Sequence, residues 1–326
     1  MNFDALATRV LDGHQVTRKE AAAMLDCAEG NVSDLMNAAA RLREAQHGRD
    51  VTLHVLQNAK SGSCPEDCTF CSQSTHFDTD VDQYRIQTVD ELVSAAREAY
   101  ALGATRYCMV TSTRAPTGNE LKRICDATER IKSEMPIQIC ASLGFLDDRS
   151  ARTLKDAGVD RFNHNIETSE RHFKNLVTTH EWSDRVDTVK AAKAAGMEAC
   201  CGGIIGMGEA PEDRLDMAFS LRELEVESIP LNFLDPRPGT PMGDCERLSA
   251  SECLKTLAMM RFVNPTRDIR VAGGREKALG PQQSLALKAA NSLFTQGYLT
   301  TGGQGYQADI DLIEDAGYRV ALVLPA

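Results

Sequence analysis

Three closely spaced cysteines could hold an iron–sulfur cluster. Cys64, Cys68 and Cys71 form a C-x3-C-x2-C pattern, and no further cysteine follows until Cys108. Thiolates this close together can reach three irons of one [4Fe-4S] cube, whose ordinary protein ligation uses four cysteines. The missing fourth cysteine predicts a [4Fe-4S] cluster with one iron left open to bind something else.

Two simpler interpretations of these cysteines fit less well. Zinc sites favour paired C-x2-C units, and bacterial ferredoxins use C-x2-C-x2-C followed by a fourth cysteine. Neither the second pair nor the fourth cysteine is present near this motif. The spacing instead resembles that of the radical S-adenosylmethionine (SAM) superfamily. This resemblance implies that the open iron binds the amino and carboxylate groups of SAM, and that an electron from the cluster breaks a carbon–sulfur bond.

Composition restricts the class of protein. Hydrophobic residues make up 42% of the 326 residues, which is typical of a folded globular chain. Eleven cysteines without a recognisable secretory signal argue for metal ligands and free thiols, and we expect a cytoplasmic enzyme. The net charge of −11 argues against a nucleic-acid partner. No apolar run reaches the roughly 18 residues of a membrane span, so no membrane contact is expected.

Apolar runs of strand length alternate with amphipathic helices along most of the chain. Strands are expected over 51–58, 105–112, 137–142, 160–167, 197–205, 228–234, 268–273 and 292–299. Strands joined by helices predict βαβ units and a parallel sheet, and this number of units fits a (β/α)8 TIM-type barrel. We expect an N-terminal helical extension over 1–45, the barrel over 46–300, and a short C-terminal tail over 301–326 that packs on the barrel.

Side chains of a barrel strand alternate between the lumen and the helical shell. In the strands expected between 137 and 273, the apolar face must pack against helices, so the polar face points into the lumen. The polar lumen set includes Cys140, Asn163, Asn165, Glu167, Cys200, Asn232 and Arg270. Cys201 and His164 have the opposite parity. We expect both in the helical shell, with His164 a hydrogen-bonded core residue.

Three thiols and a guanidinium therefore converge in the expected lumen. They are Cys108, Cys140, Cys200 and Arg270. The strand of Cys108 has no clearly apolar face, so its direction is the least certain of the four. A single buried cysteine is usually an inert small hydrophobic residue, but several thiols on polar strand faces indicate a second metal site. We expect no chemical role for the cysteines on helices and loops, which are Cys27, Cys125, Cys245 and Cys253.

Several longer motifs resemble the biotin synthase family, within a likeness that covers about residues 45–315. They are SGSCPEDCTFCSQS at 61–74, YCM at 107–109, FNHNIETS at 162–169, CGGIIGMGE at 201–209 and GRE at 274–276. The resemblance implies a [4Fe-4S] cluster on Cys64, Cys68 and Cys71. It also implies a [2Fe-2S] cluster whose ligands are Cys108, Cys140, Cys200 and the unusual ligand Arg270. Cys201 departs from the family, which commonly has Ser or Thr at this position.

The resemblance also implies an activity and contacts with SAM. The activity is radical insertion of sulfur into dethiobiotin to give biotin, through a 5′-deoxyadenosyl radical, with the [2Fe-2S] cluster as the sulfur donor. Phe70 and Ile204 lie in loops whose backbone would approach SAM, although Phe70 could simply pack under the cluster. Glu167 would accept hydrogen bonds from the ribose of SAM, or could cap a helix. Arg185 could pair with a carboxylate of SAM or substrate, or could be a charge on a helix surface.

The expected lumen amides suit a polar substrate. Asn163, Asn165 and Asn232 have the donors and acceptors to hold a ureido ring, and amides left unsatisfied in a lumen would be costly. We expect an electron donor such as flavodoxin or ferredoxin, and a homodimer. Two alternatives are another enzyme similar to biotin synthase, of the hydrogenase-maturation or amino-acid-mutase type, and a non-catalytic iron–sulfur carrier. The first is expected to lack part of the second ligand set, and the second would not need an open iron.

Overall fold

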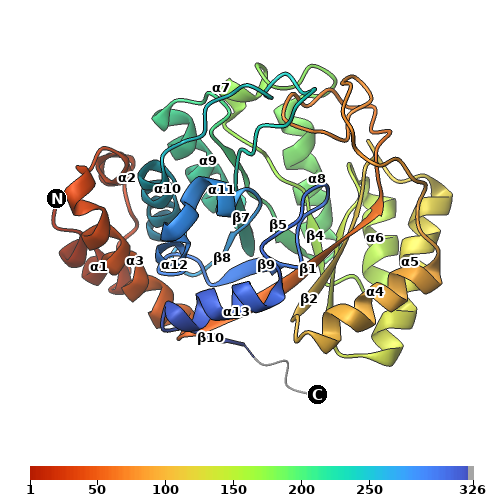
Figure 1. Ribbon diagram of the computed structural model, residues 1–326, viewed down its shortest axis with the longest axis horizontal. Helices are drawn as coiled ribbons and strands as arrows, with labels where there is room; N and C mark the ends of the chain where they lie inside the picture. The colour runs from red at the N-terminus through yellow and green to blue at the C-terminus, as the bar shows by residue number, and fades with distance from the viewer. Residues whose placement is uncertain (322–326) are drawn as a thin grey trace.

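Parallel strands form a closed ring at the centre of the computed structural model, which describes residues 1–321 (Figure 1). Around the ring, the strands are β1 (Asp50–Lys60), β2 (Arg106–Thr111), β3 (Gln138–Ser142), β4 (Arg161–Asn163), β5 (Glu198–Cys200), β7 (Ser228–Phe233), β8 (Asp268–Val271) and β9 (Ser292–Thr295). Each strand pairs with the next, and β9 pairs back onto β1, with Leu53 beside Leu293. The expected (β/α)8 TIM-type barrel is confirmed.

Three strands differ clearly from the sequence prediction, and one of them, expected over 292–299, ends at Thr295. The strand expected over 160–167 ends at Asn163, and the strand expected over 197–205 is divided into β5 and β6 (Gly203–Ile205). The division lies opposite Pro230 of β7, which has no N–H to donate to a neighbouring strand. Gly202 lies within the division, where a Cβ would be only 2.0 Å from the carbonyl oxygen of Pro230. The carboxyl end of this side of the barrel is therefore irregular backbone.

Helices cover the outside of the barrel (Figure 1). They are α4 (Val89–Ala101), α5 (Gly118–Glu134), α6 (Asp148–Asp156), α7 (Glu170–Phe173), α8 (Trp182–Ala194), α9 (Pro211–Glu223), α10 (Ala250–Val263), α11 (Arg275–Leu279) and α12 (Gln283–Ala286). A capping box of Thr88 with Glu91 begins α4, as the sequence spacing indicates. The apolar stripe of α4 shares one core with Tyr107 of β2 and Ile139 of β3. This packing directs the alternate residues of those strands into the lumen.

Both ends of the described chain pack on the barrel. The helices α1 (Phe3–Leu11), α2 (Arg18–Leu25) and α3 (Val32–His47) lie beside α9 and α10 (Figure 1). After the barrel, α13 (Tyr306–Asp315) leads to β10 (Arg319–Val320), which pairs with the start of β1. The domain boundaries remain a prediction, and residues 322–326 of the expected tail lie outside the described part. No helix within residues 1–321 has the length and apolarity needed to cross a bilayer.

A buried ion pair joins α13 to the barrel. Arg275 and Asp309 are each about 1% exposed, and a guanidinium nitrogen lies 2.5 Å from the carboxylate. The same carboxylate accepts a hydrogen bond of 2.9 Å from Gln304. Because removing one partner leaves a buried charge poorly compensated, this pair should contribute strongly to the attachment of α13.

We expect Asp309→Ala to lower the free energy of unfolding by about 2–3 kcal/mol, since it removes a charged hydrogen-bond partner from a buried guanidinium. Unfolding in denaturant measures the loss. Asp311→Ala is the matched control, because Asp311 lies on the same helix but is exposed; its effect should stay within about 0.5 kcal/mol. Equal losses in the two variants would contradict the stabilising role of the buried pair.

Candidate active site

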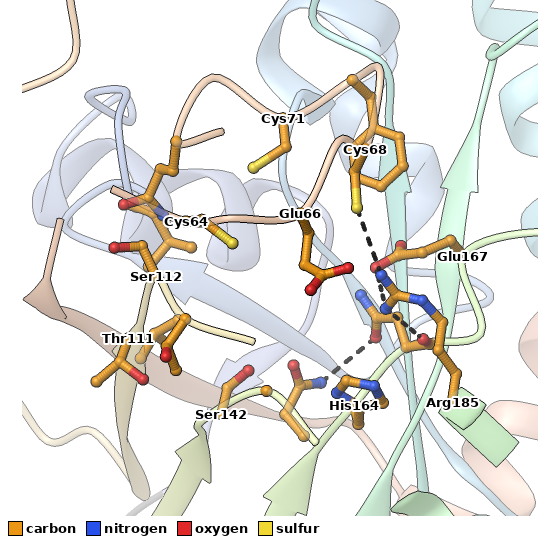
Figure 2. Close-up of a pocket in the computed structure, with 18 of the residues that line it drawn as sticks. Cys64, Glu66, Cys68, Cys71, Thr111, Ser112, Ser142, His164, Glu167 and Arg185 are labelled. Carbon is orange, nitrogen blue, oxygen red and sulfur yellow. Dashed lines mark hydrogen bonds and ion pairs between the residues drawn. The ribbon is translucent and has the colours of Figure 1, made fainter. Parts of the chain in front are cut away.

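A cavity of about 330 Å³ lies at the carboxyl ends of the barrel strands. Thr111, Ser142 and Asn163, which end β2, β3 and β4, all line it. Figure 2 shows the cysteine loop on one side of this cavity and Arg185 with Glu167 on another. Active sites of (β/α)8 enzymes occur at this face, so the cavity is the candidate active site.

The loop after β1 brings all three motif cysteines to the cavity (Figure 2). The backbone N–H of Cys64 donates to the carbonyl of Gln73 over 3.1 Å. The Gln73 side-chain oxygen is itself a brace, because it accepts hydrogen bonds of 3.2 Å from both the Ser61 hydroxyl and the Gly62 N–H. The loop is thus held at both ends, and its thiols share one wall of the cavity.

The donor set at this wall fits an iron–sulfur cluster better than a single metal ion. Within residues 1–321, no group of three His, Cys, Asp or Glu side chains converges closely enough to bind one ion. The cysteines of a cube bind different irons, so they need not converge on one point. Burial raises the pKa of Cys68 to about 12 and that of Cys71 to about 11; binding iron as thiolates would therefore release protons. Among the described residues lining the cavity, no fourth cysteine occurs.

Glu167 lines the cavity and has one carboxylate oxygen without a partner among the described residues. The residue has a positive φ of 67°, and its side chain is largely buried. Its Oε1 lies 3.3 Å from Arg185, whereas its Oε2 is buried and has no hydrogen-bond partner among the described residues. Burial raises the pKa of Glu167. Because an unsatisfied buried oxygen is costly, a ligand donor is expected there. The helix-capping alternative is wrong, since Ser169 caps α7.

Arg185 is buried, so the alternative that it is a helix-surface charge is wrong. It lies in the first turn of α8 and donates to the carbonyl of Asn165 over 3.0 Å. Its second terminal nitrogen lies 3.7 Å from the sulfur of Cys68 (Figure 2). Arg185 thus connects the cysteine loop to the strand end that carries Glu167.

The second set of thiols lies deeper in the barrel than the cavity. Cys108 and Cys140 are register partners on β2 and β3 and share a small core cluster. Arg270 is about 1% exposed and points a guanidinium nitrogen at the sulfur of Cys200 over 3.7 Å. Contact with the Cys140 thiol, together with the Arg270 charge, lowers the pKa of Cys108. Cys140, Cys200 and Arg270 therefore face the lumen, as the parity of their strands predicts, and Cys108 lies beside Cys140; their role as one ligand set remains a prediction.

Two further arginines close the lumen below these thiols, and the sequence did not single them out. The guanidinium of Arg161 on β4 lies 2.7 Å from Glu198 and 3.1 Å from Asp268, and Arg106 on β2 lies 3.2 Å from the same Glu198. Both arginines are buried. They place positive charge next to the thiols, which would favour an anionic group there.

The three predicted asparagines line the cavity, but their amides are already used in part. Asn163 donates to the sulfur of Cys200 over 3.3 Å, and the oxygen of Asn165 accepts from the Gly202 N–H over 3.1 Å. Asn232 donates to Gly203 over 3.2 Å and accepts a backbone N–H over 2.9 Å. Because protein groups already satisfy part of each amide, the cost of unsatisfied amides is a weaker argument for a ligand than the sequence suggests. Their role toward a substrate remains a prediction.

His164 was expected in the helical shell, and this prediction is wrong. Its side chain lines the cavity, with its ring 5.2 Å from that of Phe145. Its Nε2 is buried and has no hydrogen-bond partner among the described residues. The parity argument fails because β4 ends at Asn163, so the alternation no longer applies one residue later. Cys201, by contrast, lies in the hydrophobic core as expected.

Sequence analysis missed the residues that connect the cysteine loop to the segment before α8. The carboxylate of Asp67 accepts the backbone N–H groups of Thr178 and Thr179 over 3.0 and 3.1 Å. Glu66 accepts a hydrogen bond of 2.7 Å from Arg114 and contacts His180. Glu66 and Asp67, which lie between Cys64 and Cys68, could have indicated these contacts. Carboxylates beside thiolates need hydrogen-bond donors or cations from elsewhere in the chain.

The two remaining predicted residues also line the cavity. They are Phe70, on the cysteine loop, and Ile204, on β6. The backbone N–H of Ile204 donates to the carbonyl of Glu167 over 2.9 Å. Their contacts with SAM remain a prediction.

Comparisons with known proteins agree with this geometry. The sequence pattern of the Radical SAM superfamily matches residues 59–221, and that of the Biotin and Thiamin Synthesis associated domain matches residues 230–319. The chain is 57% identical to the biotin synthase of Salinibacter ruber, over 98% of this chain and 89% of that protein. It is 48% identical to the biotin synthase of Rhodopirellula baltica, with the same coverage.

Solved structures support the fold alone, because their sequences are distant. Methylornithine synthase superposes with a TM-score of 0.86 at 18% identity, over 97% of both chains. The FeFe-hydrogenase maturase of Carboxydothermus hydrogenoformans superposes with a TM-score of 0.83 at 16% identity, over 99% of this chain and 80% of that chain.

We expect Gly203→Ala to destabilise the protein by at least about 1–3 kcal/mol, the usual effect of overpacking. A Cβ at Gly203 would lie 2.2 Å from the carbonyl oxygen of Glu167, so the strand end must move. Denaturant unfolding measures the change. Gly302→Ala is the control, because a Cβ there meets nothing within 4 Å. A Gly203→Ala protein as stable as this control would show that the close approach is not required.

Proposed function

Because this chain belongs to the biotin synthase family, within the radical SAM superfamily, we propose that it inserts sulfur into dethiobiotin to form biotin. It is a radical SAM sulfur-inserting enzyme, and membership of this superfamily implies a [4Fe-4S] cluster and SAM. The observation that carries the proposal is the arrangement of two thiol sets. One set lines the wall of a cavity, and the other lies with a guanidinium deeper in the same barrel.

We propose that Cys64, Cys68 and Cys71 hold the [4Fe-4S] cluster, and that Cys108, Cys140, Cys200 and Arg270 hold a [2Fe-2S] cluster. When bound, the first cluster would supply the electron that cleaves SAM, and the second would supply sulfur. The donor sets support this assignment, since thiolates are the usual ligands of both clusters. The buried charges of Arg106 and Arg161 support an anionic group near the second set.

The residues of the cavity would bind and orient SAM. The free oxygen of Glu167 is placed to accept a hydrogen bond from a ribose hydroxyl, and Arg185 offers a buried cation for a carboxylate. Phe70 and Ile204 would contact SAM from the cysteine loop and from β6. Buried groups of both charges allow a zwitterionic ligand to be held without a net unpaired charge.

The dethiobiotin site would lie between the two thiol sets. Asn163 lines the cavity and also contacts Cys200, so it lies between the cavity and the deeper set of thiols. Asn165 and Asn232 lie on the same wall, and amide atoms not used by the backbone could bind a ureido ring. The apolar side chains of Leu56, Val110 and Phe294 also line this space. They would exclude water from a reaction that must avoid stray hydrogen donors.

The sequence alternatives are less well supported. Against the hydrogenase-maturation or amino-acid-mutase type, the FeFe-hydrogenase maturase and methylornithine synthase share 16% and 18% identity with this chain, whereas a biotin synthase shares 57%. An iron–sulfur carrier would not need the buried unpaired oxygen of Glu167. We further propose a cytoplasmic homodimer that receives electrons from flavodoxin or ferredoxin. Anaerobic reconstitution, with iron and sulfide counts and an assay for biotin from dethiobiotin, tests the function directly.

Replacing Cys64, Cys68 or Cys71 by Ala should abolish reductive cleavage of SAM, because each variant leaves only two cysteines for the cluster. Formation of 5′-deoxyadenosine in reconstituted protein measures it. Cys245→Ala is the matched control, since Cys245 is exposed and should be dispensable. A motif variant that still forms 5′-deoxyadenosine at the rate of the control would refute the assignment of the first cluster.

Cys200→Ala and Cys201→Ala are a matched pair of substitutions. Both cysteines are buried and adjacent in sequence, but Cys200 faces the lumen and Cys201 faces the helical shell. Cys200→Ala should lose the iron and sulfide of the second cluster and all biotin formation, while SAM cleavage survives in part. Cys201→Ala should keep both clusters. Iron and sulfide per chain are the measurements. The reverse result would mean that the register of this strand end is displaced by one residue.

A further inference from the structure

A line of charged and polar side chains runs across the site from Arg114 to Glu167. Glu66 accepts a hydrogen bond of 2.7 Å from Arg114 and lies 2.5 Å from Nδ1 of His180. The other ring nitrogen of His180, Nε2, accepts a hydrogen bond of 3.0 Å from Nε of Arg185. Arg185 then reaches Glu167 over 3.3 Å. His180 is therefore the central member, and no step of the proposed reaction has used it.

These contacts fix which nitrogen of His180 carries the proton. The guanidinium of Arg185 can only donate, so Nε2 of His180 must accept and has no hydrogen. The hydrogen must then be on Nδ1, where it is donated to the Glu66 carboxylate. Burial and the Arg185 charge lower the pKa of His180, which agrees with a neutral ring.

The ring of His180 has little freedom to move. Its side chain is 0% exposed. It lies edge-on between two aromatic rings, with centroid distances of 5.0 Å to Phe145 and 5.5 Å to Phe173. Thr179 also donates to the same Glu66 oxygen over 2.5 Å. A neutral histidine held this firmly is a fixed acceptor, not a mobile acid or base.

A fixed acceptor at Nε determines the plane of the Arg185 guanidinium. With Nε engaged by His180, the two terminal nitrogens are turned toward the cavity side, where they meet the Asn165 carbonyl at 3.0 Å and the Cys68 sulfur at 3.7 Å. A planar guanidinium binds a carboxylate well only when its donors are aligned with it. The orientation of Arg185 therefore depends on His180, whose two ring nitrogens are both engaged by protein groups.

We propose that His180 is a positioning residue, which holds Arg185 in the orientation that binds the carboxylate of a cavity ligand. This inference rests on the proposed function, in which SAM is that ligand. It assigns His180 no proton transfer. It predicts that the acceptor at the Nε2 position matters more for SAM binding than the donor at the Nδ1 position.

The tautomer can be measured without iron or SAM. Long-range ¹H–¹⁵N spectra of the ¹⁵N-histidine-labelled, iron-free protein should show His180 as the neutral Nδ1–H form, with its signals assigned from their loss in His180→Asn. A neutral Nε2–H form, or a protonated ring at pH 7.5, would overturn the proposal, because neither can accept from Arg185.

Two substitutions separate the roles of the two nitrogens. His180→Gln can place an oxygen near the Nε2 position and keep the acceptor for Arg185, whereas His180→Asn keeps a donor near Glu66 and loses that acceptor. In reconstituted protein with equal iron content, equilibrium titration with SAM should show about tenfold weaker binding for His180→Asn. Binding to His180→Gln should stay within about threefold of the unaltered protein, and the rate at saturating SAM should change little in either variant.

His172→Asn is the matched control, because His172 lies just upstream and its Nε2 contacts only the Met207 carbonyl at 3.1 Å; it should bind SAM normally. Equal weakening in His180→Gln and His180→Asn, or unchanged binding in His180→Asn, would overturn the positioning role. The unaltered protein is titrated first. If it fails to bind SAM, the proposed function itself is wrong, whereas a difference confined to the variants concerns His180 alone.

Discussion

The two-residue alternation of the barrel strands is the constraint on which the site depends. Helices packed on one face of β2 and β3 oblige Cys108 and Cys140 to face inward as register partners. The same alternation on β8 turns Arg270 toward Cys200. Side chains far apart in sequence thus meet in the lumen, because each strand packs its apolar face against the surrounding helices. A shift of one residue in any of these strands would exchange a thiol for a core residue.

This constraint also explains how far the sequence could predict the site. The barrel and the inward direction of Cys140 and Cys200 follow from apolar runs and parity, which are local patterns, whereas the strand of Cys108 has no clear parity signal. Parity failed at His164, because the regular strand ends at Asn163 and the chain pairs again through an isolated bridge at Glu167, which has a positive φ. That irregularity depends on Gly202 and Gly203 meeting backbone from other elements. Contacts of this kind are tertiary and leave no periodic signal.

Burial of charge is the second feature that shapes the site. Arg185 and Glu66 are both largely buried, and each has partners on a different segment of chain. Buried charges must be paired and hydrogen-bonded, so the cysteine loop, the segment before α8 and the end of β4 are held in one arrangement. The sequence shows the acidic residues between the cysteines. It does not show that His180, just before α8, contacts Glu66 and accepts a hydrogen bond from Arg185 on α8.

Closure of the ring sets an order of events during synthesis. The strand that leads into the cysteine loop, β1, is made early, yet one of its two barrel neighbours is β9, near the far end of the chain. The ring therefore cannot close until residues 292–295 have left the ribosome, and these pairings between distant segments are intrinsically slow to form. A nascent chain carries its motif thiols without their final surroundings for most of its synthesis. A cluster held deep in the lumen, as proposed, could gain its full ligand set only after Arg270 on β8 has been made, late in synthesis.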